Sequence, residues 1–323
     1  MMRTLLFLGV ALLAPSLNAA MISLGPAQDF NIFVFGDHTQ SFVDAGGRVA
    51  VGGNATYAHY GIGTSLPSST TRADLIVGGD IDITGGTNFN GNTAISSTGS
   101  VINYSMTNNN GVPGQPLVAD LIDFAAAQAD LIARSNTWAA LAPTGSVAVN
   151  FGQLDLTGSD PLLNVFNIDG NDIGGSGFSL ATLNGINVIA PETSTVLINI
   201  LGDNVGFGSY QIFVNGGQPN SSVDATRFMW NFSEANYAFN QHIGVIGSIL
   251  APNADYTGFG GNIDGTLVAN SLNGAVELHD FQFEGDLPPP TPGNEEVPEP
   301  TTLSLFGAGL LALAYATRKR RRG

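Results

Sequence analysis

The sequence contains no cysteine, and between Asp29 and Glu299 it contains no lysine and only four arginines. Without cysteine, neither a disulfide framework nor a thiolate metal site can form. The same stretch carries all 26 acidic residues of the chain. A surface with this excess of negative charge repels phosphate backbones and anionic lipid. The composition therefore argues against nucleic acid as a partner and against charge-driven membrane binding, and it makes divalent cations the natural counterions.

Motifs of common enzymes are also missing. The four histidines lack metal-ligand spacing, and no Gly-x-Ser-x-Gly elbow or phosphate loop occurs. Two carboxylate pairs, Asp80 with Asp82 and Asp169 with Asp172, leave a polysaccharide-active enzyme as an alternative. A lyase acting on a uronate would need basic residues to stabilise the developing anion, and few are present. We therefore predict a protein that is not an enzyme.

The first 20 residues have the layout of a secretory signal peptide. A single early charge, Arg3, precedes an apolar stretch at 5–14, and small residues follow at 18–20. This order predicts cleavage near Ala20 and an exported protein, so residues 1–20 are excluded from the fold.

The C-terminal end carries a second signal. A Pro-Glu-Pro tripeptide is followed by an apolar run at 301–317 and a basic cluster, and the residues concerned are Val297, Pro298, Glu299, Pro300, Arg318, Lys319, Arg320, Arg321 and Arg322. This order resembles the PEP-CTERM sorting tail of exported Gram-negative bacterial proteins. The resemblance implies an exosortase-type enzyme as a partner. The run is shorter than the roughly 20 residues that span a bilayer comfortably, which favours transient retention in the inner membrane over an ordinary tail anchor. The basic cluster predicts a cytoplasmic end.

Between the two signals the sequence predicts short strands separated by glycine. Segments such as 48–51, 74–77, 195–200 and 210–214 are β-branched and are flanked by Gly, Asn or Asp. Two short repeats occur: Gly247–Asn253 recurs 18 residues later at Gly265–Ser271, and the block at 49–54 is echoed at 76–80. Repeats too small to bury their own apolar face predict an all-β fold, a parallel β-helix (solenoid), with a β-sandwich as the alternative.

One alanine-rich segment breaks the strand pattern. From Pro116 to Ala142, apolar residues recur at helical spacing through Leu121, Ile122, Phe124 and Ile132. Pro116 suits a first helical position, and Pro143 with Gly145 ends the run. We expect one long α-helix packed along the flank of the solenoid.

The N-terminal segment 30–37, the block at 46–54, the helical segment and the late repeats together resemble the choice-of-anchor A domain. That family of exported bacterial surface domains is regarded as adhesive, and no catalytic residue is described for it. The resemblance implies a domain at 21–285, followed by a Pro-rich acidic linker at 286–299 and the sorting segment at 297–323. The architecture and the motif at 247–251 are also similar to bacterial ice-binding proteins, by analogy only.

Two kinds of binding residue are predicted. Alternating oxygen ligands around a glycine suggest a Ca²⁺ loop at Asn167, Asp169, Asn171 and Asp172, with simple Asx turns as the alternative. Exposed aromatic rings suggest glycan contacts at Tyr57, Tyr60 and Trp230, with His59, Tyr237 and Phe239 in similar surroundings and burial in the core as the alternative.

These observations predict a secreted protein of the cell surface or extracellular matrix, with adhesion as its function. Its ligand would be exopolysaccharide or another surface. An ice-binding solenoid is the alternative within binding proteins, although only scattered threonine pairs occur. Because the linker contains Pro288, Pro289 and Pro290, it would be a stiff spacer before the tail.

Overall fold

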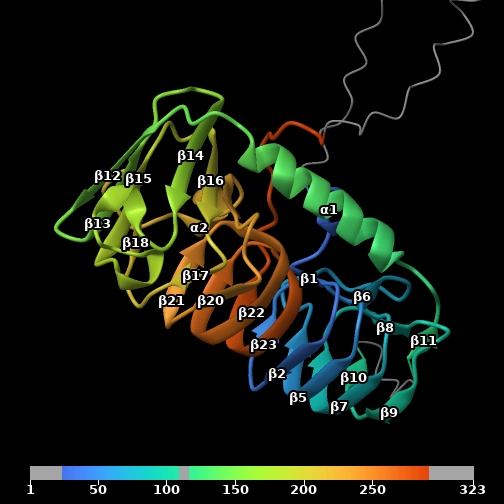
Figure 1. Ribbon diagram of the computed structural model, residues 1–323. Helices are drawn as coiled ribbons and strands as arrows, with labels where there is room; N and C mark the ends of the chain where they lie inside the picture. Colours follow the sequence, from blue (N-terminus) through green and yellow to red (C-terminus); the bar gives the residue numbers. More distant parts are fainter. Residues whose placement is uncertain (1–23, 109–115, 291–323) are drawn as a thin grey trace, which may run out of the picture. The chain divides into compact units, whose positions relative to one another are not determined.

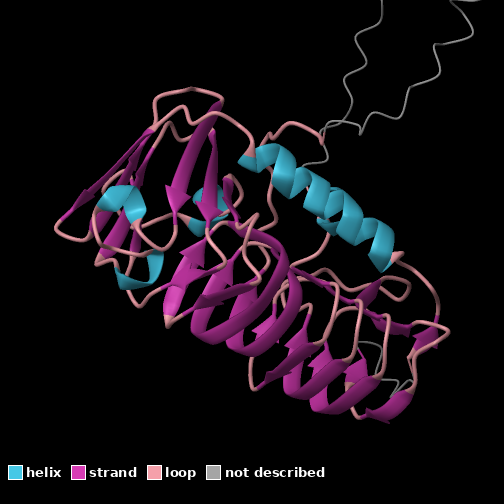
Figure 2. Ribbon diagram, viewed as in Figure 1, coloured by secondary structure: helices cyan, strands magenta, loops and turns pink. Residues whose placement is uncertain are grey.

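The computed structural model describes residues 24–108 and 116–290. This part of the chain is rich in strands and has few helices, which confirms the predicted all-β class (Figures 1 and 2). None of its helices is long and apolar enough to cross a membrane. The predicted signal peptide at 1–20 and the sorting segment at 297–323 lie outside the described residues.

Nineteen strands of the described residues form the main sheet, and its strand pairs are parallel and fall into three ladders. The first ladder lies beneath the long helix. Across it, in order, stand β11 (Leu117–Val118), β8 (Asn92–Ile95), β6 (Ala73–Val77), β4 (Val49–Val51), β1 (Ile32–Val34), β23 (Leu267–His279), β22 (Ser248–Asp264), β19 (Phe228–Asn231), β16 (Thr195–Leu201) and β14 (Leu163–Asp169).

The second and third ladders share long strands that turn a corner. The second ladder contains β9 (Val101–Tyr104), β7 (Ile81–Asn88), β5 (Ala55–Ile62), β2 (His38–Ser41), the middles of β23 and β22, β20 (Tyr237–Asn240) and β17 (Asn204–Phe207). The third contains β10 (Thr107–Asn108), the ends of β7 and β5, β3 (Asp44–Ala45), the ends of β23 and β22, and β21 (Ile243–Ile246).

The sequence repeats mark neighbouring turns of the chain. Ile249 pairs with Leu267, so the repeats at 247–253 and 265–271 lie side by side. The Gly-Gly corners at 52–53 and 78–79 also stack, with the Gly79 N–H donating to the Gly53 carbonyl at 2.8 Å. A Cβ on Gly79 would lie 2.6 Å from that carbonyl oxygen, so this close approach requires glycine.

Asx side chains link the same corners. Asp37 Oδ1 accepts the Asn54 N–H, Asn54 Oδ1 accepts the Asp80 N–H, and Asp80 Oδ1 accepts the Ser100 N–H, at 2.7–2.8 Å. Asp80 therefore stabilises a corner, while Asp82 lies further along on β7. This hydrogen bond gives Asp80 a structural role in place of the catalytic pairing considered above.

The chain starts in the middle of the stack. Ile32 in β1 pairs with Val49 on one side and with Leu267 on the other, so the first turn lies between the second and the last. The chain then winds outward to β11, returns along α1 and winds back through β14, β16 and β19 (Figure 1). Sixteen helical residues cover about 24 Å, or roughly five strand spacings.

A smaller sheet of four strands contributes to the same interior core. It contains β12 (Ser146–Asn150), β13 (Gln153–Thr157), β15 (Gly185–Ile189) and β18 (Ile212–Val214). β12 and β13 form an antiparallel hairpin, and β15 and β18 add in parallel. Short helices stand at Gly25–Ala27, Ile173–Gly175, Leu180–Thr182 and Ser221–Asp224, the last labelled α2.

The long helix is α1, Phe124–Ala139, and the predicted span of 116–142 is wrong at its start. Leu117 and Val118 pair with β8 and extend the first ladder instead. Asp123 caps the helix, accepting the Ala126 N–H at 3.0 Å.

The face of α1 that packs on the first ladder matches the predicted stripe only in part, through Phe124 and, just before the helix, Ile122. Its buried residues are Ala127, Leu131, Ser135 and Trp138, whereas Leu121 is 54% exposed and lies before the helix. The buried side chains meet outward-facing ladder residues in a second core, separate from the interior one. α1 thus packs along the outer side of the first ladder.

A column of asparagines joins α1 to the first ladder. Asn167, Asn199 and Asn231 are in register on β14, β16 and β19. Asn199 Nδ2 donates to the Trp138 carbonyl at 2.9 Å and to Asn167 Oδ1 at 2.8 Å. Asn231 Nδ2 donates to the Ser135 carbonyl and to Asn199 Oδ1, both at 2.9 Å. The column thus ties the C-terminal half of α1 to the first ladder through hydrogen bonds that satisfy the buried asparagine amides.

Candidate binding face

The outward side of the second ladder carries a column of polar residues in register. Strand alternation creates it: in β2, His38 and Gln40 point into the core and Thr39 points outward. Neighbouring strands repeat this pattern in register. We call the resulting column the polar ladder face, which consists of Thr257, Asn273, Thr39, Thr56, Asp82 and Asn103.

The members of this face are short and polar and follow one another at the strand spacing of about 4.8 Å. Phe239 on β20 continues the column beyond Thr257. The hydroxyls of Thr39 and Thr56 form no hydrogen bond with any described residue, so they are available to a ligand. The face is therefore a row of regularly spaced polar groups about 24 Å long, in which the hydroxyls of Thr39 and Thr56 are unpaired.

An aromatic hollow of about 410 Å³ lies at one end of the polar ladder face. Tyr237, Phe239 and Phe259 line it, and the Tyr237 and Phe239 ring centroids lie 5.9 Å apart. The amide side chains of Asn204 and Gln241 line it as well. Rings and amides together offer stacking surface and hydrogen bonds, which is the chemistry that sugar rings require.

Basic side chains are absent from the face among the described residues, because all four arginines act elsewhere. Arg134 and Arg227 pair with Asp130 and Asp224. The Arg48 guanidinium lies 4.3 Å from the centroid of the Phe30 ring. The face therefore has no cation for an anionic ligand.

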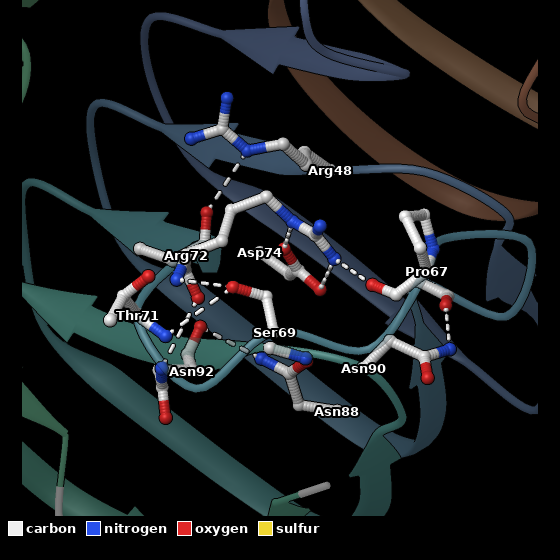
Figure 3. Close-up of polar contacts among 12 residues, drawn as sticks. Arg48, Pro67, Ser69, Thr71, Arg72, Asp74, Asn88, Asn90 and Asn92 are labelled. Atoms are coloured by element: carbon white, nitrogen blue, oxygen red, sulfur yellow. Dashed lines mark hydrogen bonds and ion pairs between the residues drawn. The ribbon is translucent and has the colours of Figure 1, made fainter.

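The fourth arginine belongs to the polar network of Figure 3. Arg72 Nε lies 2.5 Å from Asp74 Oδ1, and its Nη2 donates to the Pro67 carbonyl at 2.8 Å. Ser69 Oγ accepts the Arg72 N–H, and Asn90 donates to the Gly63 carbonyl. These groups satisfy one another and hold the loop between β5 and β6, so the network is structural.

The structure contradicts the predicted glycan contacts at Tyr57, Tyr60 and Trp230. All three side chains are buried in the interior core. Tyr57 stacks on Tyr60 with ring centroids 4.5 Å apart, and Trp230 Nε1 donates to the Ile246 carbonyl at 2.7 Å. They point inward because each shares its strand face with other core residues, so no sugar can reach them. Tyr237 and Phe239, by contrast, do line the hollow.

The predicted calcium residues do not converge on one point. Asn167 belongs to the asparagine column beneath α1. Asp169 Oδ1 accepts the Asn171 N–H at 2.9 Å, and Asp172 Oδ1 accepts the Gly177 N–H at 2.8 Å, as in Asx turns. Within the described part of the chain, no group of three or more His, Cys, Asp or Glu could hold a metal ion. Calcium binding here stays a prediction that this geometry does not support.

Sequence reasoning missed the polar ladder face, although a signal was present. Thr39 and Thr56 are 17 residues apart, close to the 18-residue repeat of β22 and β23. Residues separated by one turn of the chain share a face when the register is kept. The scattered threonines were therefore neighbours in space.

No curated protein matches the chain. Two solved structures are similar to it. One is an ice-binding protein from the Antarctic ascomycete Antarctomyces psychrotrophicus, with 14% identity, coverage of 83% of this chain and 99% of that chain, and a TM-score of 0.33. The other is an ice-binding protein from an Antarctic biological consortium, with 14% identity, coverage of 87% of this chain and 95% of that chain, and a TM-score of 0.32. At these scores the likeness carries no argument here.

Two family matches identify the C-terminal tail and the domain that precedes it. Residues 296–322 match the PEP-CTERM protein-sorting motif, which confirms the tail and implies export, surface sorting and exosortase-dependent processing. Residues 23–280 match the family described as "Putative Ice-binding-like adhesive domain". Because this match covers most of the sequence, the chain belongs to the family of ice-binding-like adhesive domains.

Proposed function

We propose that this protein is an exported adhesin whose polar ladder face binds an extended polysaccharide. The observation that carries the proposal is the in-register column from Thr257 to Asn103 on six neighbouring strands. A sugar chain lying across the strands would meet a new row of side chains at each spacing of about 4.8 Å, roughly the length of one pyranose ring. Adhesion to a repeating ligand gains strength from such multiple weak contacts.

The aromatic hollow supports a glycan as the ligand. Sugar rings pack their C–H faces on aromatic rings, and Phe239 stands in the same column as Thr257. The absence of basic side chains on the face and the excess of acidic residues disfavour uronate polymers and favour a neutral polysaccharide. The same features favour binding over catalysis.

Ice is the second candidate ligand. The family match and the threonines at 39, 56 and 257, all in one column, favour it. The carboxylate of Asp82 and the aromatic hollow have no role in matching an ice lattice, whereas both suit a polysaccharide. Measuring thermal hysteresis of freezing solutions together with polysaccharide binding distinguishes ice from polysaccharide as the ligand.

Replacing Thr39 and Thr56 together with valine is expected to weaken polysaccharide binding about tenfold. Valine keeps the shape and strand preference but removes the hydroxyl, and each lost hydrogen bond contributes roughly 0.5–1.5 kcal/mol. Co-sedimentation with exopolysaccharide of the native host measures the change. The matched control is Thr157→Val, on β13 of the small sheet. Equal binding by the double variant and the wild type would contradict the proposal.

Processing of the tail provides a separate test. We expect cleavage near Pro298, Glu299 and Pro300, so that the mature protein lacks the basic cluster at 318–322. Intact-mass measurement on protein from the native host checks this. Recovery of the full chain with its arginines would show that the tail is a permanent anchor.

We further infer that the three ladders form the faces of a β-solenoid and that the domain is akin to the choice-of-anchor A group. The stacked Gly-Gly corners and the pairing of 247–253 with 265–271 support the solenoid. In this arrangement residues 1–20 are the signal peptide, 21–285 the adhesive domain and 286–299 the linker. The inner membrane is then a transient partner through residues 297–323.

A further inference from the structure

Two aromatic residues at the corner between the second and third ladders adopt an unfavourable backbone conformation. Phe42 has φ 58° and His59 has φ 52°, in the left-handed region that residues with bulky side chains seldom occupy. Their rings stack, with centroids 5.0 Å apart and planes at 27°. Phe42 is nevertheless 77% exposed. The backbone thus bears strain to hold an aromatic pair in solvent, and strain of this kind gathers at ligand sites.

This aromatic pair forms one wall of a recess of about 390 Å³ on the third ladder. Phe89, 44% exposed, lines the recess as well. Gly61 contributes to the floor, where a Cβ would lie 3.1 Å from Phe89 Cε2 and 3.0 Å from Asp44 Cβ. Glycine at 61 therefore leaves room for the Phe89 ring and the Asp44 side chain.

Two carboxylates face the same recess. Leu278 pairs with Ala45, which places Glu277 beside Asp44 on neighbouring strands. The Asp44 carboxylate accepts no hydrogen bond from the described residues. Glu277 Oε2 lies 3.9 Å from His279 Nε2, and the other ring nitrogen of His279 lies 2.6 Å from Asp264 Oδ1. No lysine or arginine lines the recess.

We propose that this recess binds a hexosamine unit of a cationic polysaccharide, one whose amino groups are free and protonated. The sugar ring would pack on Phe89 and on the Phe42–His59 pair, and its ammonium group would meet Asp44 and Glu277. A uronate would be repelled by both carboxylates. A neutral sugar would leave Asp44 without a partner, and a bare metal ion would make no use of the rings. This site is separate from the polar ladder face and does not rest on the function proposed for it.

The test is isothermal titration of the purified full chain with a glucosamine tetramer and with its N-acetylated counterpart. We expect the free amine to bind at least tenfold more tightly, and its binding to weaken as salt rises. Asp44→Asn and Phe89→Ala are each expected to weaken it at least tenfold. Thr157→Val, on β13 of the small sheet, is the matched control and should leave this affinity unchanged.

Several outcomes would overturn the proposal. Equal affinity for the two tetramers would remove the role of the ammonium group, and undiminished binding by Phe89→Ala would remove the role of the recess. Loss of binding in the double variant Thr39→Val with Thr56→Val would move the site to the polar ladder face. Thermal melting checks that each variant folds. If Phe89→Ala does not fold, Phe89→Leu replaces it, because leucine keeps the apolar bulk but lacks the ring.

Discussion

Replacing Arg72 with methionine is expected to lower the free energy of unfolding by about 3 kcal/mol. Asp74 is fully buried, and Arg72 is 25% exposed on its outer side. Removing the guanidinium leaves a buried carboxylate without its ionic partner, and breaking such pairs costs about 3–5 kcal/mol. The lower figure applies because solvent reaches the arginine. Urea denaturation followed by circular dichroism measures the loss.

The double variant Arg72→Met with Asp74→Asn provides the control. It removes both charges, so no uncompensated carboxylate remains, and part of the stability lost in the single variant should return. A double variant as unstable as the single one would mean that the loop hydrogen bonds, such as the one to the Pro67 carbonyl, matter more than the charge.

Acidification from pH 6.5 to pH 4 is expected to remove about 3 kcal/mol of stability through His38 alone. Burial lowers the pKa of His38 from 6.5 to about 4, against the smaller opposing influence of its hydrogen bond to Gln40. Gln40 Nε2 donates to the Val276 carbonyl, so its Oε1 accepts from His38 Nε2, and His38 Nδ1 accepts the Tyr57 hydroxyl. The folded protein thus holds a neutral imidazole.

The direction of this pH dependence of stability follows from proton uptake at His38. Between pH 6.5 and 4 the unfolded chain binds a proton at His38 that the folded protein excludes, so stability is complete above pH 6.5 and declines as the pH falls. Unfolding curves over this range measure the slope, which His38→Asn should flatten. His279 acts oppositely, since the hydrogen bond that it donates to Asp264 raises its pKa and its contribution is lost as the pH rises. An unchanged slope in His38→Asn would contradict the assignment.

Local sequence signals predicted much of the fold. The 18-residue recurrence at 247 and 265 corresponds to adjacent strands, and the Gly-Gly blocks correspond to stacked corners, because each repeat buries its apolar face only against the next. The flanking helix was predicted from its composition. Its start was not predicted, because Leu117 and Val118 pair with β8 as an added strand instead of forming a helical turn. This strand pairing is a tertiary contact, and the periodicity of the local sequence does not indicate it.

The binding residues were harder to predict, for a related reason. Whether a side chain points inward or outward depends on strand parity, and a shift of one residue reverses it. Tyr57 and Thr56 are adjacent, yet Tyr57 lies in the core and Thr56 on the polar ladder face. Glycine-rich surroundings indicated exposure at Tyr57 and Tyr60, whereas here glycine marks corners. Only the register across strands distinguishes inward-facing from outward-facing side chains.

Starting the stack from its middle has a mechanical consequence for a surface protein under load. The linker leaves the fold just after β23, which pairs with β22 on one side and with β1, β2 and β3 on the other. Tension on the tail therefore acts on an interior strand and cannot unzip the sheet from a free edge. The linker also contacts α1, with Trp138 Nε1 donating to the Pro288 carbonyl at 2.8 Å. Detaching the tail means shearing β23 out of all three ladders at once, a geometry suited to holding a cell against flow.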